Sequence, residues 1–204
     1  MRMINEMPSP VLVTGQMNFI FRARMLWRDL ATWMTIYMVS ALGGYPNQAA
    51  LTARLYELPL EYGNFLRLVY GQIPAEEYIN LLSVYIINFL NFFHAQMSGD
   101  AAAAEIYARQ MIQNLNQRAE FLSRINPYWQ SGAWRSLLYN FHNLMLEDAQ
   151  TLLTNDFERN VGVFDRIMAF SSVIGDYFSE GILNYLAFPG TVVPVQSERM
   201  RESK

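Results

Sequence analysis

The stretch YINLLSVYIINFLNFFHAQMSG, residues 78–99, contains no charged side chain, and the fold of this chain is decided there. It is as long as a membrane span, which takes roughly 20 apolar residues. However, it also carries polar side chains, among them Asn80, Asn88, His94 and Gln96. Because polar groups are costly in lipid, we expect a helix that other helices cover, and no transmembrane span.

Helical periodicity extends from this stretch toward the N-terminus, where no segment alternates polar and apolar residues as a strand does. Residues 16–42 are predicted to form one helix that ends at Gly43. Proline inside a helix removes a backbone hydrogen bond. We therefore expect Pro59 to divide two short helices, residues 47–58 and 60–70, that pack as an insert.

The same periodicity continues toward the C-terminus. Gly99 is predicted to end the central helix, and Asp100 to cap the next one. In that helix Glu105 is spaced to pair with Arg109, and Glu120 with Arg124, each one turn later. A tight reversal is expected at Asn155, with capping side chains beside it. The long helices are expected over residues 16–42, 74–97, 101–125, 134–152 and 157–185.

Five long helices with short reversals predict an all-α fold, an up-and-down bundle whose two short helices cap one end. One domain accounts for the length of 204 residues. We expect an extended N-terminal arm over residues 1–15, a single helical-bundle domain over residues 16–187, and a flexible C-terminal tail over residues 188–204.

Composition excludes several classes of protein. Hydrophobic residues make up 52% of the chain and charged residues 16%, which is far from the composition of a disordered protein. The net charge of −3 gives no basic excess for nucleic acid. There is no cysteine, which excludes disulfides and thiolate metal sites. The N-terminus lacks the basic-then-apolar order of a signal peptide, so a cytoplasmic location is expected.

Motifs of catalysis are missing from the sequence. It has no Gly-x-Ser-x-Gly elbow, no phosphate-binding glycine loop and no Glu-x-x-His pair of a di-metal bundle. We therefore expect no catalytic residues and no cofactor, although an enzyme of another type stays open. The alternative is a ferritin-like bundle that binds a divalent metal ion or another small ligand. Its candidate metal ligands are His142, Glu147, Asp148, Asp176 and Glu180.

Three segments carry a resemblance to a known group: INPYW at residues 125–129 before a Trp-led helix, NLNQRAEFL at residues 114–122, and the spacing of Trp27 and Trp33. Through them the chain resembles small all-helical proteins of spore-forming Firmicutes that have no assigned function. These proteins often carry the labels acetylglutamate kinase or glycosyltransferase, and this chain has no motif that supports either label. The likeness covers most of residues 25–187.

This chain departs from the pattern of that group at several polar positions. A histidine stands in the pattern where this chain has Leu30, Tyr85 and Phe141, and Asn-Ala-Asp-Glu stands where it has residues 114–117, Asn-Leu-Asn-Gln. The resemblance therefore implies that any histidine and carboxylate site of the group is dismantled here.

The leading hypothesis is a non-catalytic helical bundle that acts through self-association or through a protein partner, as a structural or assembly component. It depends on the low charged fraction and on the apolar helix around residues 78–97, because large apolar surfaces mark interaction sites. A homo-oligomer or a protein partner is expected, and nucleic acid is not.

Overall fold

The structure is a computed structural model that describes residues 14–188. All the regular elements of this part of the chain are α-helices and it has no β-strand, which confirms the all-α prediction. The six helices are α1 (Thr14–Gly43), α2 (Gln48–Tyr70), α3 (Gln72–Ser98), α4 (Ala101–Ile125), α5 (Ser131–Leu153) and α6 (Phe157–Ala187).

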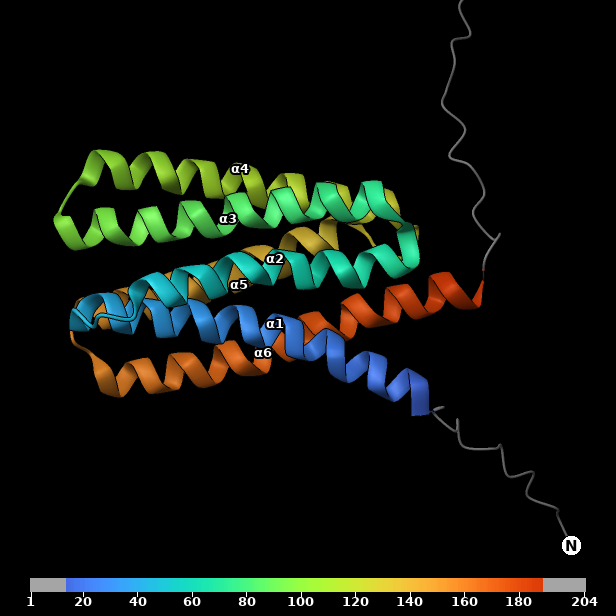
Figure 1. The fold of residues 1–204 in the computed structure, drawn as a ribbon, viewed down its shortest axis with the longest axis horizontal. Helices are drawn as coiled ribbons and strands as arrows, with labels where there is room; N and C mark the ends of the chain where they lie inside the picture. The colour runs from blue at the N-terminus through green and yellow to red at the C-terminus, as the bar shows by residue number, and fades with distance from the viewer. Residues whose placement is uncertain (1–13, 189–204) are drawn as a thin grey trace, which may run out of the picture.

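The helices form a bundle in which neighbours in sequence run in opposite directions (Figure 1). Each helix packs against the next one along the chain, and α1 also contacts α5 and α6. The α3–α4 pair lies at one side of the bundle, the α1–α6 pair at the other, and α2 and α5 lie between them (Figure 1). The first and last helices are therefore neighbours.

The prediction of two short helices divided at Pro59 was wrong. Residues 48–70 form the single helix α2, which contains Pro59. Leu55 and Leu58 before the proline and Tyr62 after it are all fully buried on one face. Burying such side chains is worth roughly 1.5–3 kcal/mol each, which outweighs the cost of about 3 kcal/mol for a proline in a helix. The bundle thus has six helices where five long and two short ones were expected.

The helix ends follow the local capping signals. Gly99 has a left-handed backbone with a φ of 74°, and it ends α3. The side chain of Asp100 accepts a hydrogen bond from the backbone N–H of Ala103 at 2.9 Å. Asn155 has a positive φ of 58° in the turn before α6, and Asp156 caps α6. These predicted turns and caps are confirmed.

Helix α3 contains the uncharged stretch that was predicted to be covered by other helices. It is the one helix within residues 14–188 that is long and apolar enough to cross a membrane, and half of its most apolar window is buried inside the bundle. Tyr78, Tyr85 and Phe89 lie in the core, whereas Val84 and Ile87 are exposed. Packing against α2 and α4 therefore covers one face of α3.

Most of the two predicted terminal segments lies outside the described residues. Helix α1 begins at Thr14, within the expected arm of residues 1–15, and α6 ends at Ala187, just before the expected tail of residues 188–204.

Helices α1 and α6 approach each other closely because α6 carries a glycine at the contact. A Cβ atom on Gly175 would lie 2.6 Å from the Cα atom of Arg24 in α1, where no side chain fits. At the centre of the bundle the rings of Trp27 and Trp134 stack with their centroids 6.1 Å apart. The core is thus rich in large aromatic side chains.

Candidate functional site

A buried carboxyl group joins three helices near the α5–α6 turn. Asp148 of α5 is fully buried. Its Oδ2 accepts a hydrogen bond from Thr35 Oγ1 of α1, and its Oδ1 accepts one from Asn160 Nδ2 of α6, both at 2.6 Å. Burial raises the pKa of Asp148, and the two hydrogen bonds act against this shift. The carboxyl group therefore holds α1, α5 and α6 in register.

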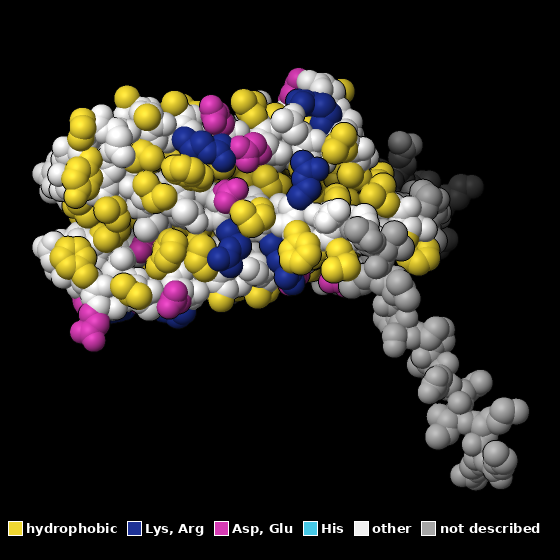
Figure 2. Space-filling view, turned by 60° about the horizontal axis from the view of Figure 1, so that its bottom comes forward, with side chains coloured by type: hydrophobic (Ala, Val, Ile, Leu, Met, Phe, Trp, Pro, Cys, Tyr) yellow, Lys and Arg dark blue, Asp and Glu magenta, His cyan; other side chains and the backbone are white. Residues whose placement is uncertain are grey.

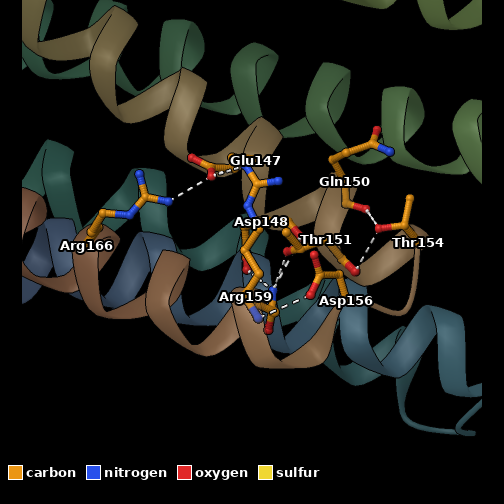
Figure 3. Close-up of polar contacts among 9 residues, drawn as sticks. Glu147, Asp148, Gln150, Thr151, Thr154, Asp156, Arg159 and Arg166 are labelled. Atoms are coloured by element: carbon orange, nitrogen blue, oxygen red, sulfur yellow. Dashed lines mark hydrogen bonds and ion pairs between the residues drawn. The ribbon is translucent and has the colours of Figure 1, made fainter.

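Glu147, the residue before Asp148, has different partners from Asp148 (Figure 3). Its Oε1 forms ion pairs with Arg166 Nη2 at 2.8 Å and with Arg159 Nη2 at 2.6 Å, both on α6. Hydrogen bonds from Arg166 and Arg159 lower the pKa of Glu147. Adjacent helical residues are about 100° apart around the axis, so Glu147 and Asp148 have separate partners.

Asp176 and Glu180 lie one turn apart on α6, in a groove against α1. The guanidinium of Arg24 pairs with Asp176 through two contacts, Nε to Oδ1 at 2.5 Å and Nη2 to Oδ2 at 2.9 Å. The groove has a volume of about 340 Å³, and Arg24, Asp176 and Glu180 line it. The arginine thus neutralises Asp176, whereas Glu180 forms no ion pair within residues 14–188.

His142 of α5 is buried beside Tyr85 of α3. Its Nδ1 lies 3.1 Å from the Tyr85 hydroxyl, at hydrogen-bond distance. Burial lowers the pKa of the imidazole to about 4, so His142 is neutral at pH 7. Burial also raises the pKa of the Tyr85 hydroxyl.

The structure does not bring the five predicted metal ligands into one site. His142 contacts Tyr85, Glu147 is held by two arginines, Asp148 faces Thr35 and Asn160, and Asp176 pairs with Arg24. Within the part of the chain that the structure describes, no three histidine, aspartate or glutamate side chains form a group that could hold a metal ion. Of the five, Asp176 and Glu180 share a groove, and metal binding stays a prediction.

Sequence reasoning missed Arg118 of α4, which lies in the core with 1% of its surface exposed. Its Nη2 donates a hydrogen bond to the Tyr78 hydroxyl at 3.0 Å. Its guanidinium carbon lies 5.2–5.8 Å from the ring centroids of Trp27, Tyr78 and Tyr85, at cation–π distance. Among residues 14–188 it forms no ion pair with a carboxylate.

One signal in the sequence could have located Arg118. It follows Leu115 by three residues and precedes Leu122 by four, and both leucines lie in the core. This spacing places the arginine on the apolar face of α4.

Unpaired hydrogen-bond donors lie in the core around Trp27, whose ring face contacts the Arg118 guanidinium. Trp27 Nε1, Tyr62 Oη, Arg118 Nε and Trp134 Nε1 are buried and have no hydrogen-bond partner among the described residues. We call these four residues the buried donor cluster. Trp27 contacts the other three, by ring packing with Tyr62 and Trp134 and by its face with Arg118. Because buried donors are rarely left unpaired, the cluster is suited to an acceptor such as a water molecule or an anionic group.

Exposed apolar side chains gather at the end of the bundle where the α1–α2 and α5–α6 turns meet. Val39, Leu42, Tyr45 and Phe157, which we call the turn-end cluster, are all exposed. They line a groove of about 240 Å³ that has no charged residue in its lining. Figure 2 shows hydrophobic side chains across one face of the molecule, with charged side chains between them.

Searches against models of protein families, against curated proteins and against solved structures found no match for this chain.

Proposed function

We propose that this protein is a cytoplasmic, non-catalytic helical bundle that acts through protein–protein contact, either with further copies of itself or with a protein partner. It serves as a structural or assembly component, and it is related to the helical proteins of spore-forming Firmicutes that its sequence resembles. The observation that carries the proposal is the turn-end cluster, an uncharged apolar groove open to solvent.

The physical reason is the cost of leaving this surface in water. Single exposed apolar side chains are common on soluble proteins, but contiguous ones around a groove mark interaction sites. Tyr45 and Phe157 are exposed by 58% and 59%. Aromatic side chains of this kind are the residues that contribute most to protein interfaces, because they bury a large area at a small entropic cost.

The mass of the native assembly tests the proposal. The protein is isolated from its source under mild conditions and cross-linked, and its mass is measured by light scattering and by mass spectrometry. We expect an assembly well above the 23.6 kDa of one chain. A single chain without partners, both in the extract and at high concentration after purification, would contradict the proposal.

A matched pair of variants locates the contact. Phe157→Ser removes the aromatic ring from the turn-end cluster, and we expect the fraction of assembled protein to fall. Ile106→Ser, at an exposed apolar residue of α4, is the control and should leave the assembly unchanged. Circular dichroism shows whether both variants keep their helical content.

A second candidate function, binding of a small ligand inside the bundle, is favoured by the buried donor cluster. Arg118 carries a positive charge in the core, and the unpaired groups of the buried donor cluster can donate hydrogen bonds. A ligand with an anionic or carboxylate group would supply the missing acceptors and offset the cost of burying an unpaired charge.

Native mass spectrometry of the protein isolated from its source tests this second candidate. We expect the wild-type protein to carry a bound small molecule and Arg118→Met to lose it. Arg109→Met, which changes an exposed arginine of the same helix, should retain it. The absence of any bound molecule in the wild-type protein would count against ligand binding. Elemental analysis of the same sample tests the divalent-metal version.

A further inference from the structure

A second surface, on the N-terminal half of α1, has the pattern of a self-complementary contact. Phe21 and Met25 of α1 and Leu68 of α2 are exposed by 54%, 52% and 83%. Met25 and Leu68 line a groove of about 340 Å³ between α1 and α2. This groove also contains Arg22 and Asp29, which carry opposite charges.

Arg22 and Asp29 have unused pairing capacity. Neither forms a hydrogen bond or an ion pair within residues 14–188, although most charged side chains around them do. Glu61 of the same groove, for example, accepts a hydrogen bond from Arg54 at 2.6 Å. Asp29 is half-buried. Burial and the charge of Glu61 raise the pKa of its carboxyl group, and the charges of Arg54 and Arg28 act against this shift. A cation placed against it from outside would therefore be favourable.

The spacing of the two charges selects the orientation of a partner helix. Arg22, Met25 and Asp29 are separated by three and four residues, so they lie along one face of α1. The two charges are about 10 Å apart along the axis. A second α1 that packs antiparallel, with the two-fold axis next to Met25, places each Arg22 opposite the Asp29 of the other copy. A parallel partner would instead bring like charges together.

We infer that two copies of this chain associate through the N-terminal halves of their α1 helices, packed antiparallel, with reciprocal Arg22–Asp29 ion pairs on either side of Met25. This inference rests on the proposed function and names the partner as a second copy. In such a two-fold contact each residue pair occurs twice, so the exposed Phe21, Met25 and Leu68 of both copies are covered together. The N-terminal end of α1 is accessible for this, since it projects away from the other helices at the edge of the bundle (Figure 1).

The size of the surface sets the strength of the association. A stable dimer buries about 800 Å² on each partner, and the side chains named here supply less than that. The dimer is therefore a weak one that forms at high concentration. Its ion pairs are exposed, so added salt should weaken it.

Charge reversal in the full-length chain tests the inference by sedimentation velocity over a range of concentrations. R22E and D29R should each weaken self-association about tenfold, because each variant places like charges opposite one another in the dimer. A mixture of the two variants should recover the wild-type affinity, since each charge then faces an opposite one. E105R, a reversal on the exposed face of α4, is the control and should leave the association unchanged.

Two results would overturn the inference, and they differ in their consequence for the proposed function. If the wild-type chain associates but R22E and D29R have no effect, or their mixture does not recover, another surface forms the contact and the proposed function stands. If the purified chain is a monomer at all concentrations, the dimer is excluded, and the mass of the native assembly then decides the proposed function separately.

Discussion

Neutral His142 should make the folded protein sensitive to mild acid. The imidazole has a pKa of about 4 in the folded chain, against 6.5 in an unfolded one. Between these values the unfolded chain binds a proton that the folded chain does not bind, so the free energy of unfolding falls as the pH is lowered. Above pH 7 this group costs no stability, and the loss of unfolding free energy grows as the pH falls from about 6.5 to 4.

The size of the effect follows from the two pKa values. At pH 5 the unfolded imidazole is almost fully protonated and the folded one is almost fully neutral, which costs about 2 kcal/mol of stability relative to pH 7. At pH 4 the cost is about 3 kcal/mol. The free energy of unfolding of a typical domain is only about 5–15 kcal/mol, so the urea midpoint should shift measurably.

Urea unfolding at pH 7 and pH 5, followed by circular dichroism, measures the effect in wild type and in His142→Gln. Glutamine does not titrate, so the variant should lose about 2 kcal/mol less than wild type between the two pH values. Other titrating groups, such as the buried Asp148, are present in both proteins and cancel in the comparison. Ile106→Ser, at an exposed residue that does not titrate, should keep the wild-type dependence. An equal loss in wild type and His142→Gln would refute the reasoning.

Three further substitutions test the packing and the polar contacts, each by urea unfolding. Gly175→Ala should destabilise the protein by several kcal/mol because its methyl group would collide with the α1 backbone, whereas Gly162→Ala, with open space around it, should be neutral or stabilise it by roughly 0.5–1 kcal/mol. Thr35→Val should cost about 1–3 kcal/mol because it removes a donor from the buried Asp148 carboxyl. Asp100→Ala should cost about 1 kcal/mol through loss of the α4 cap, and Asp100→Asn should cost less.

The helices and their ends were predictable because their signals are local. Asp100 caps the helix that begins one residue later, and its hydrogen bond spans only three residues. Gly99 and Asn155 take left-handed conformations that few other residues tolerate. Such caps and turns depend on neighbouring residues in the sequence, so they can be predicted from a single sequence.

Contacts between helices were less predictable because they depend on tertiary packing. The expected pair of Glu105 and Arg109 within α4 is confirmed, but the expected pair of Glu120 and Arg124 was wrong. Arg124 Nη2 lies 2.5 Å from Glu77 Oε1 of α3, and Glu120 lies 4.0 Å from Arg135 Nη2 of α5. A pair one turn apart on a helix is worth only about 0.3–0.5 kcal/mol, so a neighbouring helix with a suitable partner displaces it easily.

The polar core was only partly predictable from the sequence. His142 and Asp148 were singled out as possible metal ligands, and both are buried, but each has its own partner. Arg118 was missed because an arginine beside amides on a helix usually faces solvent. Its burial depends on the rings of Trp27, Tyr78 and Tyr85, which come from two other helices. No local pattern in the sequence brings those three rings together.

The low charged fraction of the chain links its buried charged residues to the proposed association. Only 16% of the residues are charged, and the core takes up Arg118 and Asp148 from this small number. Apolar residues at these two positions would often give a bundle of equal or greater stability, because burying a charge is costly. The surface is left with fewer charges and with exposed apolar residues such as Phe21 and Phe157. The proposed contacts with other copies or with a protein partner would cover the apolar side chains that this chain exposes.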